Sequence, residues 1–383
     1  MNLFEFCRVV TKVMERSDIT LNIMKKRLLS LDVLRGITVA GMILVNNGFE
    51  EGFAALQHSA WNGLTPCDLV FPSFLFIVGF STWLSLSKVQ FQPTPAVLRK
   101  VVRRTVLIFA IGLFINWFAL AMDGRPLDFA HLRYWAVLQR IAVCYLLTSL
   151  FALYVDHRHT LKVIVGLLVA YAVVLLAFDG YSTDATQNIA GRIDLWLFGA
   201  DHLYRHSPID PEGLLGTMGA TAHMLTGFLC MSFISQTDDI RHKVYRLLMA
   251  GGLMMLLGFL LHHCGLPVNK TVWSPSFVMA TCGICSTGLA LLIYLIDIRG
   301  EGRKTWWMTV FLIFGVNPLF LYVFSECLAV VGWSTGVNEG LYASMRAAIA
   351  VPSLASLCYA LTFVAIVGLV GWLLYWRKIF IKI

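Results

Sequence analysis

Residues 67–87 read CDLVFPSFLFIVGFSTWLSLS, a stretch of 21 residues with a single charged side chain, Asp68. A helix of about 20 apolar residues is long enough to cross the roughly 30 Å hydrocarbon core of a membrane. The apolar residues here are continuous and do not alternate with polar ones, as they would in the strand of a membrane barrel. The stretch therefore predicts a transmembrane helix.

The rest of the chain has the same character. Of its 383 residues, 58% are hydrophobic and 14% are charged, whereas soluble proteins are roughly half apolar and a quarter charged. We therefore predict an all-α polytopic membrane protein, a bundle of about ten transmembrane helices. The expected spans are residues 31–47, 67–87, 101–121, 134–155, 161–178, 213–234, 245–264, 275–296, 305–330 and 350–376.

The positive charges predict the orientation of this bundle. Of the 30 Lys and Arg residues, 22 fall in the two tails and in every second loop. Loops rich in Lys and Arg are cytoplasmic, so both termini are expected on the cytoplasmic side, as an even number of spans requires. The net charge of +8 then reflects contact with anionic membrane lipid, and no nucleic acid partner is expected.

Two segments follow from this pattern, an N-terminal cytoplasmic segment (1–25) and a transmembrane domain (26–383). The nine cysteines are scattered mostly through the expected helices, which argues against a disulfide framework and against a zinc site. Cys282 and Cys285 form a CxxC pair, but small residues surround them and favour close helix packing over redox chemistry. No metal is expected.

A polar loop separates the first two spans and reads Gln57-His58-Ser59-Ala60-Trp61-Asn62-Gly63-Leu64-Thr65. An imidazole is the side chain best suited to take a proton near neutral pH, so His58 is a candidate base, although a histidine in a loop is usually just solvated. Asn46 and Asn47 end the preceding span, where an amide facing lipid would be costly. At least one of them is expected to face the bundle, either bonding a neighbouring helix or donating to a developing oxyanion.

Other polar residues lie at or near membrane depth. Asp32 and Arg35 are three residues apart and share a helix face, either as a structural pair or as a ligand contact. Arg140 falls inside an expected span, where a charge needs a partner or a water-filled cavity. Asn269 and Lys270 lie in an outer loop in which positive charge is otherwise scarce.

Several of these stretches resemble one family. The block His58-Ser59-Ala60-Trp61-Asn62-Gly63-Leu64-Thr65, followed by Asp68-Leu69-Val70-Phe71-Pro72, is similar to the membrane-embedded catalytic domain of the heparan-alpha-glucosaminide N-acetyltransferases and their bacterial relatives. The resemblance extends over about residues 26–375. It is also carried by residues 32–36, 137–141, 210–217, 269–274 and 315–317.

The resemblance implies an acyltransferase in which acetyl-CoA from the cytosol acetylates an amine of a glucosamine-type acceptor on the far side of the membrane. His58 matches the essential histidine of the family. Asn46 matches the asparagine that follows a valine at the end of the first span and is preferred to Asn47, although the loop before His58 is slightly longer here. A bacterial inner-membrane member of the family is implied.

Further site residues are expected from the same resemblance and from charge. The acceptor, an amino sugar or glycan, is expected to contact Trp61, Asn62, Asp68, Asn269 and Lys270. The phosphates of acetyl-CoA, a co-substrate, are expected near Arg35, Arg103, Arg104 and Arg140. Direct transfer and transfer through an acetyl-histidine both fit, and a homodimer is left open.

Two other functions fit the same residues. Residues 31–36 also resemble the start of a broad group of transmembrane O-acyltransferases that modify sugar hydroxyls of envelope polysaccharides. An amino-sugar permease, in which the polar residues merely line a path, is the alternative without chemistry. The block from His58 to Thr65 favours the N-acetyltransferase.

Overall fold

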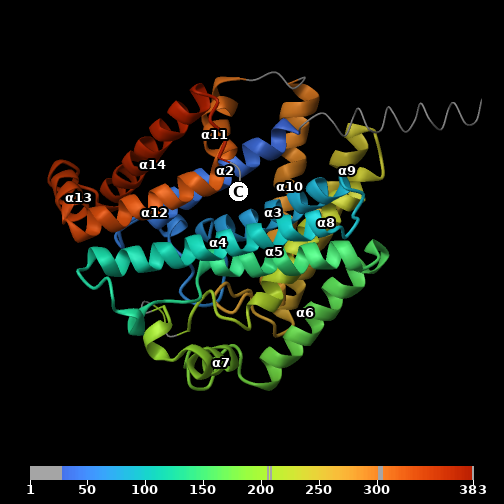
Figure 1. The fold of residues 1–383 in the computed structure, drawn as a ribbon, viewed down its shortest axis with the longest axis horizontal. Helices are drawn as coiled ribbons and strands as arrows, with labels where there is room; N and C mark the ends of the chain where they lie inside the picture. Colours follow the sequence, from blue (N-terminus) through green and yellow to red (C-terminus); the bar gives the residue numbers. More distant parts are fainter. Residues whose placement is uncertain (1–27, 205–206, 208, 301–304, 382–383) are drawn as a thin grey trace, which may run out of the picture.

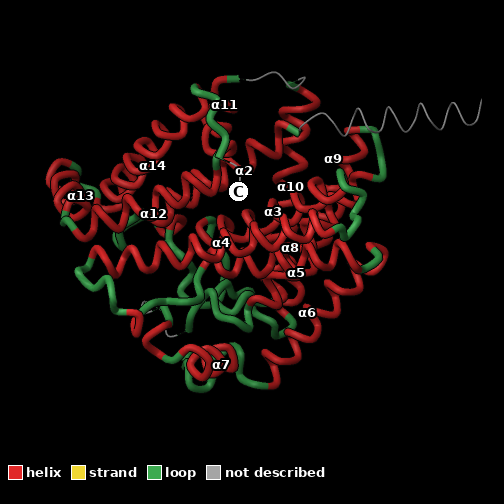
Figure 2. Tube along the Cα trace, in the orientation of Figure 1, coloured by secondary structure: helices red, strands yellow, loops and turns green. Residues whose placement is uncertain are grey.

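The computed structural model describes residues 28–204, 207, 209–300 and 305–381 (Figure 1). Every regular element among these residues is helical (Figure 2). Nine of the described helices are long and apolar enough to cross a membrane, and a bent pair of helices brings the number to ten if it counts as one span. The predicted all-α membrane bundle is confirmed, while the predicted N-terminal segment lies outside the described residues.

The long helices match the expected spans closely. They are α2 (Leu29–Asn46), α3 (Val70–Ser87), α4 (Pro95–Met122), α5 (Val137–Tyr154), α6 (Thr160–Ala177), α8 (Thr217–Ser235), α9 (Ile240–His263), α10 (Pro275–Leu292) and α14 (Pro352–Trp376). A π-helical segment, Ile293–Arg299, continues α10.

Local sequence signals explain where several of these helices begin. The Thr94 hydroxyl accepts a hydrogen bond from the Val97 amide at the start of α4, where Pro95 occupies the first turn. Ser274 caps α10 in the same way, again followed by a proline. A side-chain oxygen at the cap satisfies an amide that has no partner within the helix, and proline is tolerated in the first turn for the same reason.

Glycines allow two central helices to approach closely. A Cβ added at Gly79 of α3 would lie 1.9 Å from the Met224 carbonyl oxygen of α8, and one added at Gly227 of α8 would lie 2.2 Å from the Phe76 carbonyl oxygen of α3. Helices in a membrane gain their association mostly from such close packing. Helices α3 and α8 thus form the centre of the bundle, with α5, α6 and α10 packed around them.

The predicted ninth span, residues 305–330, is not one straight helix. It consists of α11 (Trp306–Val316) and α12 (Pro318–Ser334), which are bent by 78° relative to each other at Asn317. Pro318 explains the break, because proline lacks an amide hydrogen and clashes with the preceding turn.

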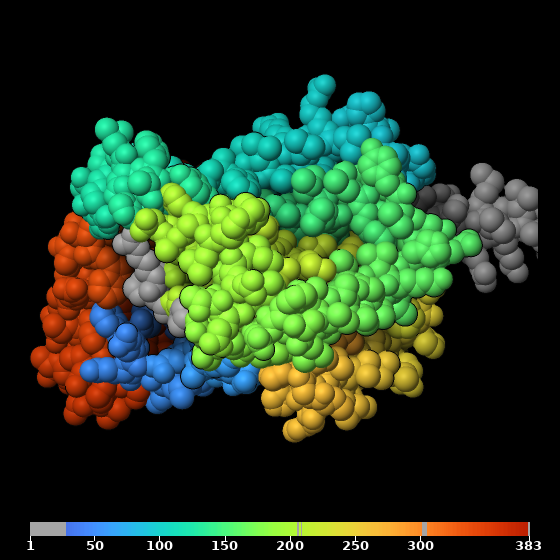
Figure 3. Space-filling model, turned by 90° about the horizontal axis from the view of Figure 1, so that it is seen from below, coloured from blue at the N-terminus to red at the C-terminus, as the bar shows by residue number. Residues whose placement is uncertain are grey.

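Two short α-helices of the described part of the chain lie outside the spans. Helix α7 (Ile189–Phe198) occupies a segment for which the sequence predicted only a loop, and α13 (Val337–Ala348) connects α12 with α14. In Figure 1 they lie at the periphery, α7 beside the long connections and α13 beyond the ends of α12 and α14. Figure 3 shows the chain after α6, in yellow-green, covering this face between α6 and the C-terminal helices.

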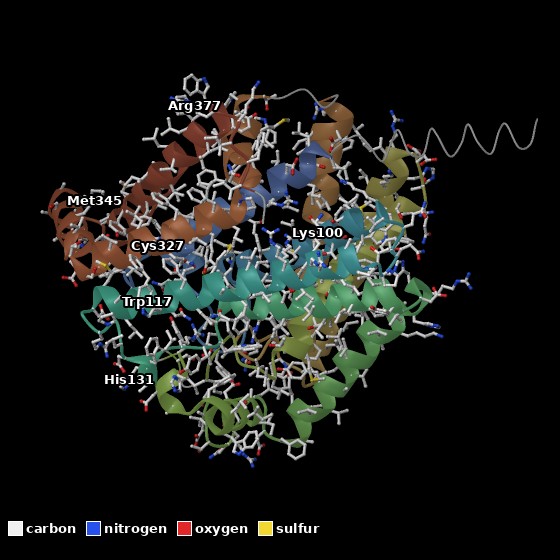
Figure 4. The ribbon with its side chains drawn as sticks, in the orientation of Figure 1. Lys100, Trp117, His131, Cys327, Met345 and Arg377 are labelled. Atoms are coloured by element: carbon white, nitrogen blue, oxygen red, sulfur yellow. The ribbon has the colours of Figure 1, made fainter. Side chains whose placement is uncertain are left out.

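The bundle has two ends, named here by what they carry. The His58 end holds the connection from α2 to α3, that from α9 to α10, and α13. The tail end holds the first residues of α2 and the last residues of α14. In Figure 4 the labelled Met345 of α13 and Arg377 after α14 mark opposite ends of α14.

Candidate active site

Asp68 organises the loop that carries His58. Its carboxylate is fully buried and accepts hydrogen bonds from the amides of Ser59 (3.1 Å) and Thr65 (3.0 Å) and from the Thr65 hydroxyl (3.0 Å). A buried carboxylate needs such donors to replace its lost hydration. The residue predicted to contact the acceptor therefore acts first as the anchor of the loop.

The other oxygen of Asp68 fixes His58. Oδ1 of Asp68 lies 2.8 Å from Nδ1 of the imidazole. An ionised carboxylate can only accept, so this contact assigns the ring proton to Nδ1 and leaves a lone pair on Nε2. The His58 side chain is 55% exposed, so part of the ring remains accessible to a ligand.

Lys270 approaches the same ring from a loop more than 200 residues away in sequence. Its Nζ lies 2.9 Å from Nδ1 and 3.0 Å from Nε2 of His58, and 3.7 Å from Oδ1 of Asp68. Burial lowers the pKa of Lys270 below its usual range, although Asp68 and Glu212 oppose this. The sequence predicted both residues as site candidates, and the structure brings them together at the imidazole.

Asn269 holds the Lys270 loop in place. Its fully buried side chain donates from Nδ2 to Oδ1 of Asn62 at 3.1 Å and accepts from the Val272 amide at 3.0 Å. Its own amide donates to the Ser274 hydroxyl, which also caps α10. Asn62 and Asn269, predicted acceptor contacts, thus join the His58 loop to the Lys270 loop.

Trp61 has a comparable supporting position. Its indole nitrogen donates to the Tyr181 carbonyl at 3.0 Å, and its ring packs against a cluster that includes Tyr171 and Val272. The structure gives this predicted acceptor contact a place in the wall behind the loop.

Cys67 was not among the predicted site residues. Its sulfur lies 3.1 Å from Nδ1 of His58, and the side chain is buried. Cys67 directly precedes Asp68 in the sequence, so the contact between Asp68 and His58 also brings this thiol close to the ring. No residue pattern pointed to it, because a lone cysteine at the start of an apolar helix is usually a packing residue.

A cavity of about 430 Å³ opens beside His58 and Cys67. It lies between the end of α2, the loop before His58 and the start of α14, and aromatic side chains form part of its wall. Its lining includes Leu44, Phe49, Glu50, Phe53, Tyr204 and Ser356. Its size and mixed lining suit a small polar ligand with apolar faces.

The two asparagines at the end of α2 differ in their surroundings. Nδ2 of Asn46 donates to Oε1 of Glu326 on α12 at 3.0 Å, across a sequence separation of 280 residues. Asn47 is buried and donates to the Ile43 carbonyl of its own helix at 2.8 Å. Asn46 therefore bonds a neighbouring helix, which is one of the two roles that the sequence left open.

Arg133, another residue that the sequence did not single out, forms an ion cluster at the His58 end. Its Nη2 donates to Oδ1 of Asp210 at 2.5 Å and to Oε2 of Glu212 at 2.8 Å. Although burial favours the neutral guanidine, Glu212 and Asp210 raise the pKa of Arg133. Its guanidinium also lies 4.9 Å from the ring of Tyr204, which lines the cavity. One cation here faces two carboxylates.

The four arginines predicted to bind phosphates do not converge. Arg35 lies near the tail end and donates to Asp32 at 3.1 Å and to Ser81 at 2.9 Å. Arg103 is exposed, and Arg104 lies 4.7 Å from the ring centre of Tyr145.

Arg140 belongs to the opposite end of the bundle. It is fully buried in the first turn of α5, donates to the Gly213 carbonyl at 2.7 Å and lies 5.3 Å from the ring centre of Trp273, three residues from Lys270. A single ligand site formed by Arg35 and Arg140 is inconsistent with these positions.

A second cavity, of about 680 Å³, lies at the tail end. Helix α2 contributes Leu29 and Asp32, which is the ion-pair partner of Arg35. Helices α11 and α14 contribute most of the remaining wall, including Trp372 and Trp376. Among the described residues, no group of three or more His, Cys, Asp or Glu side chains is arranged to hold a metal ion.

Comparison with known proteins agrees with the resemblance noted in the sequence. Residues 27–199 match the family model described as heparan-alpha-glucosaminide N-acetyltransferase, catalytic. The human heparan-alpha-glucosaminide N-acetyltransferase is 27% identical over an alignment that covers 80% of this chain and 54% of the human protein. The mouse protein of the same name is also 27% identical, with 79% and 54% covered.

The chain spans about half the length of these curated relatives. The range that matches the family model includes His58, Asp68 and Arg140. Lys270 lies outside this range. The chain is thus similar to the heparan-alpha-glucosaminide N-acetyltransferases over most of its length, and the model of their catalytic domain matches its first half in part.

Proposed function

We propose that this protein is a transmembrane acetyltransferase that moves an acetyl group from acetyl-CoA to the amino group of a glucosamine-type sugar. The single observation that carries the proposal is the imidazole of His58, held by Asp68 at 2.8 Å and by Lys270 at 3.0 Å beside a cavity. The names of the human and mouse relatives supply the reaction class.

His58 acts as the base in this proposal. The acceptor's amine nitrogen attacks the thioester carbonyl carbon, a C–N bond forms, and the amine proton passes to Nε2 of the imidazole. The carbon–sulfur bond then breaks, and the CoA sulfur leaves with that proton. Asp68 stabilises the imidazolium between the two steps because its buried charge lies against Nδ1.

The position of Lys270 supports one role. Its ammonium lies within hydrogen-bond distance of Nε2, and during attack it stabilises the oxyanion that develops on the thioester. Asn46, the other predicted catalytic residue, donates to Glu326 and follows Val45, which lines the cavity.

The charges around the cavity favour a cationic acceptor. Asp68 and Lys270 balance each other, whereas Arg133 faces both Asp210 and Glu212. The surplus of negative charge attracts an amino sugar as its ammonium ion. The ammonium loses one proton to solvent before its nitrogen attacks, and the proton that His58 takes is the second one. The aromatic ring of Tyr204, in the lining of the cavity, offers an apolar surface to one face of the sugar.

The donor reaches this site from the other side of the membrane. With most Lys and Arg residues in the tails and alternate loops, the tail end is the cytoplasmic one. The cavity at that end and Arg35 beside it then receive acetyl-CoA, while the acceptor binds at the outer face. We place the protein in a bacterial inner membrane.

The proposal is tested with purified protein in lipid nanodiscs, isotopically labelled acetyl-CoA and a panel of amino sugars, with products read by mass spectrometry. Labelled N-acetylglucosamine is expected from the native protein, and none above background from His58→Ala. The absence of any acetylated sugar, with the folded protein verified by its unfolding temperature, would refute the proposal.

The two alternatives give different results in the same assay. A sugar O-acetyltransferase would yield label on a hydroxyl and would acetylate acceptors without an amine. A permease would move glucosamine into sealed vesicles without labelling it, and His58→Ala would leave that movement intact.

A further inference from the structure

The last described residues fold back over part of the tail end of the bundle. Beyond α14, the backbone turns back instead of leaving the protein and reaches Asn317, at the break between α11 and α12. Two of these returning residues, Lys378 and Phe380, line the 680 Å³ cavity together with α2, α11 and α14. We call residues 378–381 the strap.

The reversal occurs at one residue. Lys378 has φ of 56°, a left-handed conformation that is common for glycine after a helix but unfavourable for other residues. The amide of Lys378 donates to the Tyr375 carbonyl at 3.1 Å, and that of Ile379 to the Leu374 carbonyl at 2.9 Å. These bonds close the last turn of α14 and direct the strap towards α11.

Asn317 then holds the strap by its backbone. Its Nδ2 donates to the Ile379 carbonyl at 2.9 Å, and its Oδ1 accepts from the Ile381 amide, also at 2.9 Å. Asn317 is 1% exposed and lies at the 78° break between α11 and α12. The break that Pro318 creates therefore gives the side-chain amide access to a segment more than 60 residues away in sequence.

The side chains of the strap contribute little to its attachment. Ile379, Phe380 and Ile381 are 47%, 52% and 40% exposed, so each leaves much of its apolar surface uncovered. A segment held by two hydrogen bonds and a strained turn, without a buried apolar anchor, detaches at low cost. The strap can therefore both bind to Asn317 and detach from it.

We propose that the strap is a gate, held shut by Asn317, which swings away from the tail-end cavity to admit the CoA donor. The identity of the admitted ligand rests on the proposed function, whereas the gate itself does not. Closure shields the cavity walls on α11 and α14, and opening breaks both bonds to Asn317 while leaving the bundle unchanged.

The gate is tested by the chemical accessibility of a cavity residue. Thr309 lines the cavity, so a Thr309→Cys reporter is labelled with a charged, membrane-impermeant thiol reagent in nanodiscs, and peptide-level mass spectrometry separates it from the nine native cysteines. Releasing the strap by Asn317→Ala, or deleting it by truncation after Arg377, is expected to accelerate labelling about tenfold, since two hydrogen bonds are lost. Thr305→Cys, an exposed reporter before α11 that does not line the cavity, is expected to react equally fast in all variants.

The outcomes separate the gate from the reaction. Unchanged labelling of Thr309→Cys in the truncated protein would overturn the gate, and truncation keeps this test valid where Asn317→Ala does not fold. Saturating coenzyme A is expected to slow labelling in the truncated protein, and a lack of protection would overturn the donor route. Accelerated labelling together with protection, in a protein that acetylates no sugar, would support the gate and refute the proposed function.

Discussion

The Asp68 carboxylate anchors the loop through Oδ2 and holds His58 through Oδ1. The replacement Asp68→Asn separates these two roles, because an amide has the shape of a carboxylate but only one acceptor oxygen. Three donors, the amides of Ser59 and Thr65 and the Thr65 hydroxyl, converge on Oδ2, whereas Nδ1 of His58 faces Oδ1. The single oxygen of asparagine can face one of these two groups. Its amino group must face the other.

The structure indicates which orientation of the asparagine amide is more stable. An amino group turned towards the loop would leave two buried amide donors unsatisfied, at about 1–3 kcal/mol each. The orientation in which the oxygen of the introduced asparagine faces the loop is therefore more stable than the reverse orientation by roughly 2–6 kcal/mol. In this orientation the amino group donates to Nδ1 of His58. The imidazole must then carry its proton on Nε2, where the lone pair was needed.

The expected loss of rate follows from this preference. Each 1.36 kcal/mol corresponds to a factor of ten, so kcat for acetyl transfer falls by about 30-fold to 10⁴-fold. KM for acetyl-CoA stays unchanged, because Asp68 lies at the His58 end. Adding Asp68→Asn to His58→Ala is expected to cost nothing further, since residues that act as one unit are not additive.

A matched control is available on the same side of the protein. Asp128 contacts Nδ1 of His131 at 2.7 Å in a partly exposed pair, so Asp128→Asn repeats the chemical change away from the cavity and should leave kcat unchanged. Initial rates with labelled acetyl-CoA and glucosamine give the comparison, and unfolding temperatures verify the fold. A wild-type kcat in folded Asp68→Asn would refute the assignment of the proton to Nδ1.

Three further predictions follow from the same geometry. Lys270→Met removes the ammonium beside Nε2 and is expected to lower kcat by about 10²-fold, as loss of an oxyanion donor does; an unchanged kcat in initial-rate assays would exclude that role. Asn46→Ala, which loses the bond to Glu326, should reduce transfer more than Asn47→Ala, and equal rates would contradict this. Burial raises the pKa of Asp194 from 3.8 to about 6, so the folded protein binds more protons than the unfolded chain in this window, and its stability falls as the pH rises through it, by up to roughly 3 kcal/mol. Asp194→Asn should flatten this fall in unfolding temperature between roughly pH 4 and 7, and a slope as steep as that of the native protein would argue against it.

The spans were predictable because a membrane imposes a simple rule on composition. Helices such as α3 and α14 are apolar for their full length, and their expected and observed bounds agree within a few residues. The bend at Asn317 was missed because both halves of the broken span are apolar, and hydropathy cannot register a change of direction. Pro318 was the available signal. The short α7 was missed because it lies in a polar connection.

Several residues of the candidate site could be proposed from the sequence, but their contacts could not. Loop position and residue type identified His58 and Lys270, and only the folded chain shows that the two meet. Arg133 was missed because an arginine in an outer loop usually faces water. Its partners Asp210 and Glu212 lie 77 and 79 residues further along the chain, so no local sequence pattern indicates the contact.

The position of Arg140 changes the interpretation of the buried charges. A guanidinium inside a predicted span suggested a phosphate ligand, yet among the described residues neither Nε nor Nη1 of Arg140 has a hydrogen-bond partner. Oδ2 of Asp194 is likewise buried without one, and a Cβ added at Gly213 or Gly216 would meet Asp194 or Arg140 respectively. The two opposite charges thus flank one glycine turn, and each offsets part of the cost of burying the other.

This arrangement explains why the turn contains glycines and what it supports. Any larger residue would enter the space between the charges, and the turn leads directly into α8, whose Gly219 lies against the Trp273 backbone. Trp273 in turn follows Lys270 in the loop that reaches His58. Arg140 therefore stabilises the layer behind the His58 imidazole through Gly213 and Trp273, and under the proposed function the donor phosphates are expected to bind at the tail end, near Arg35.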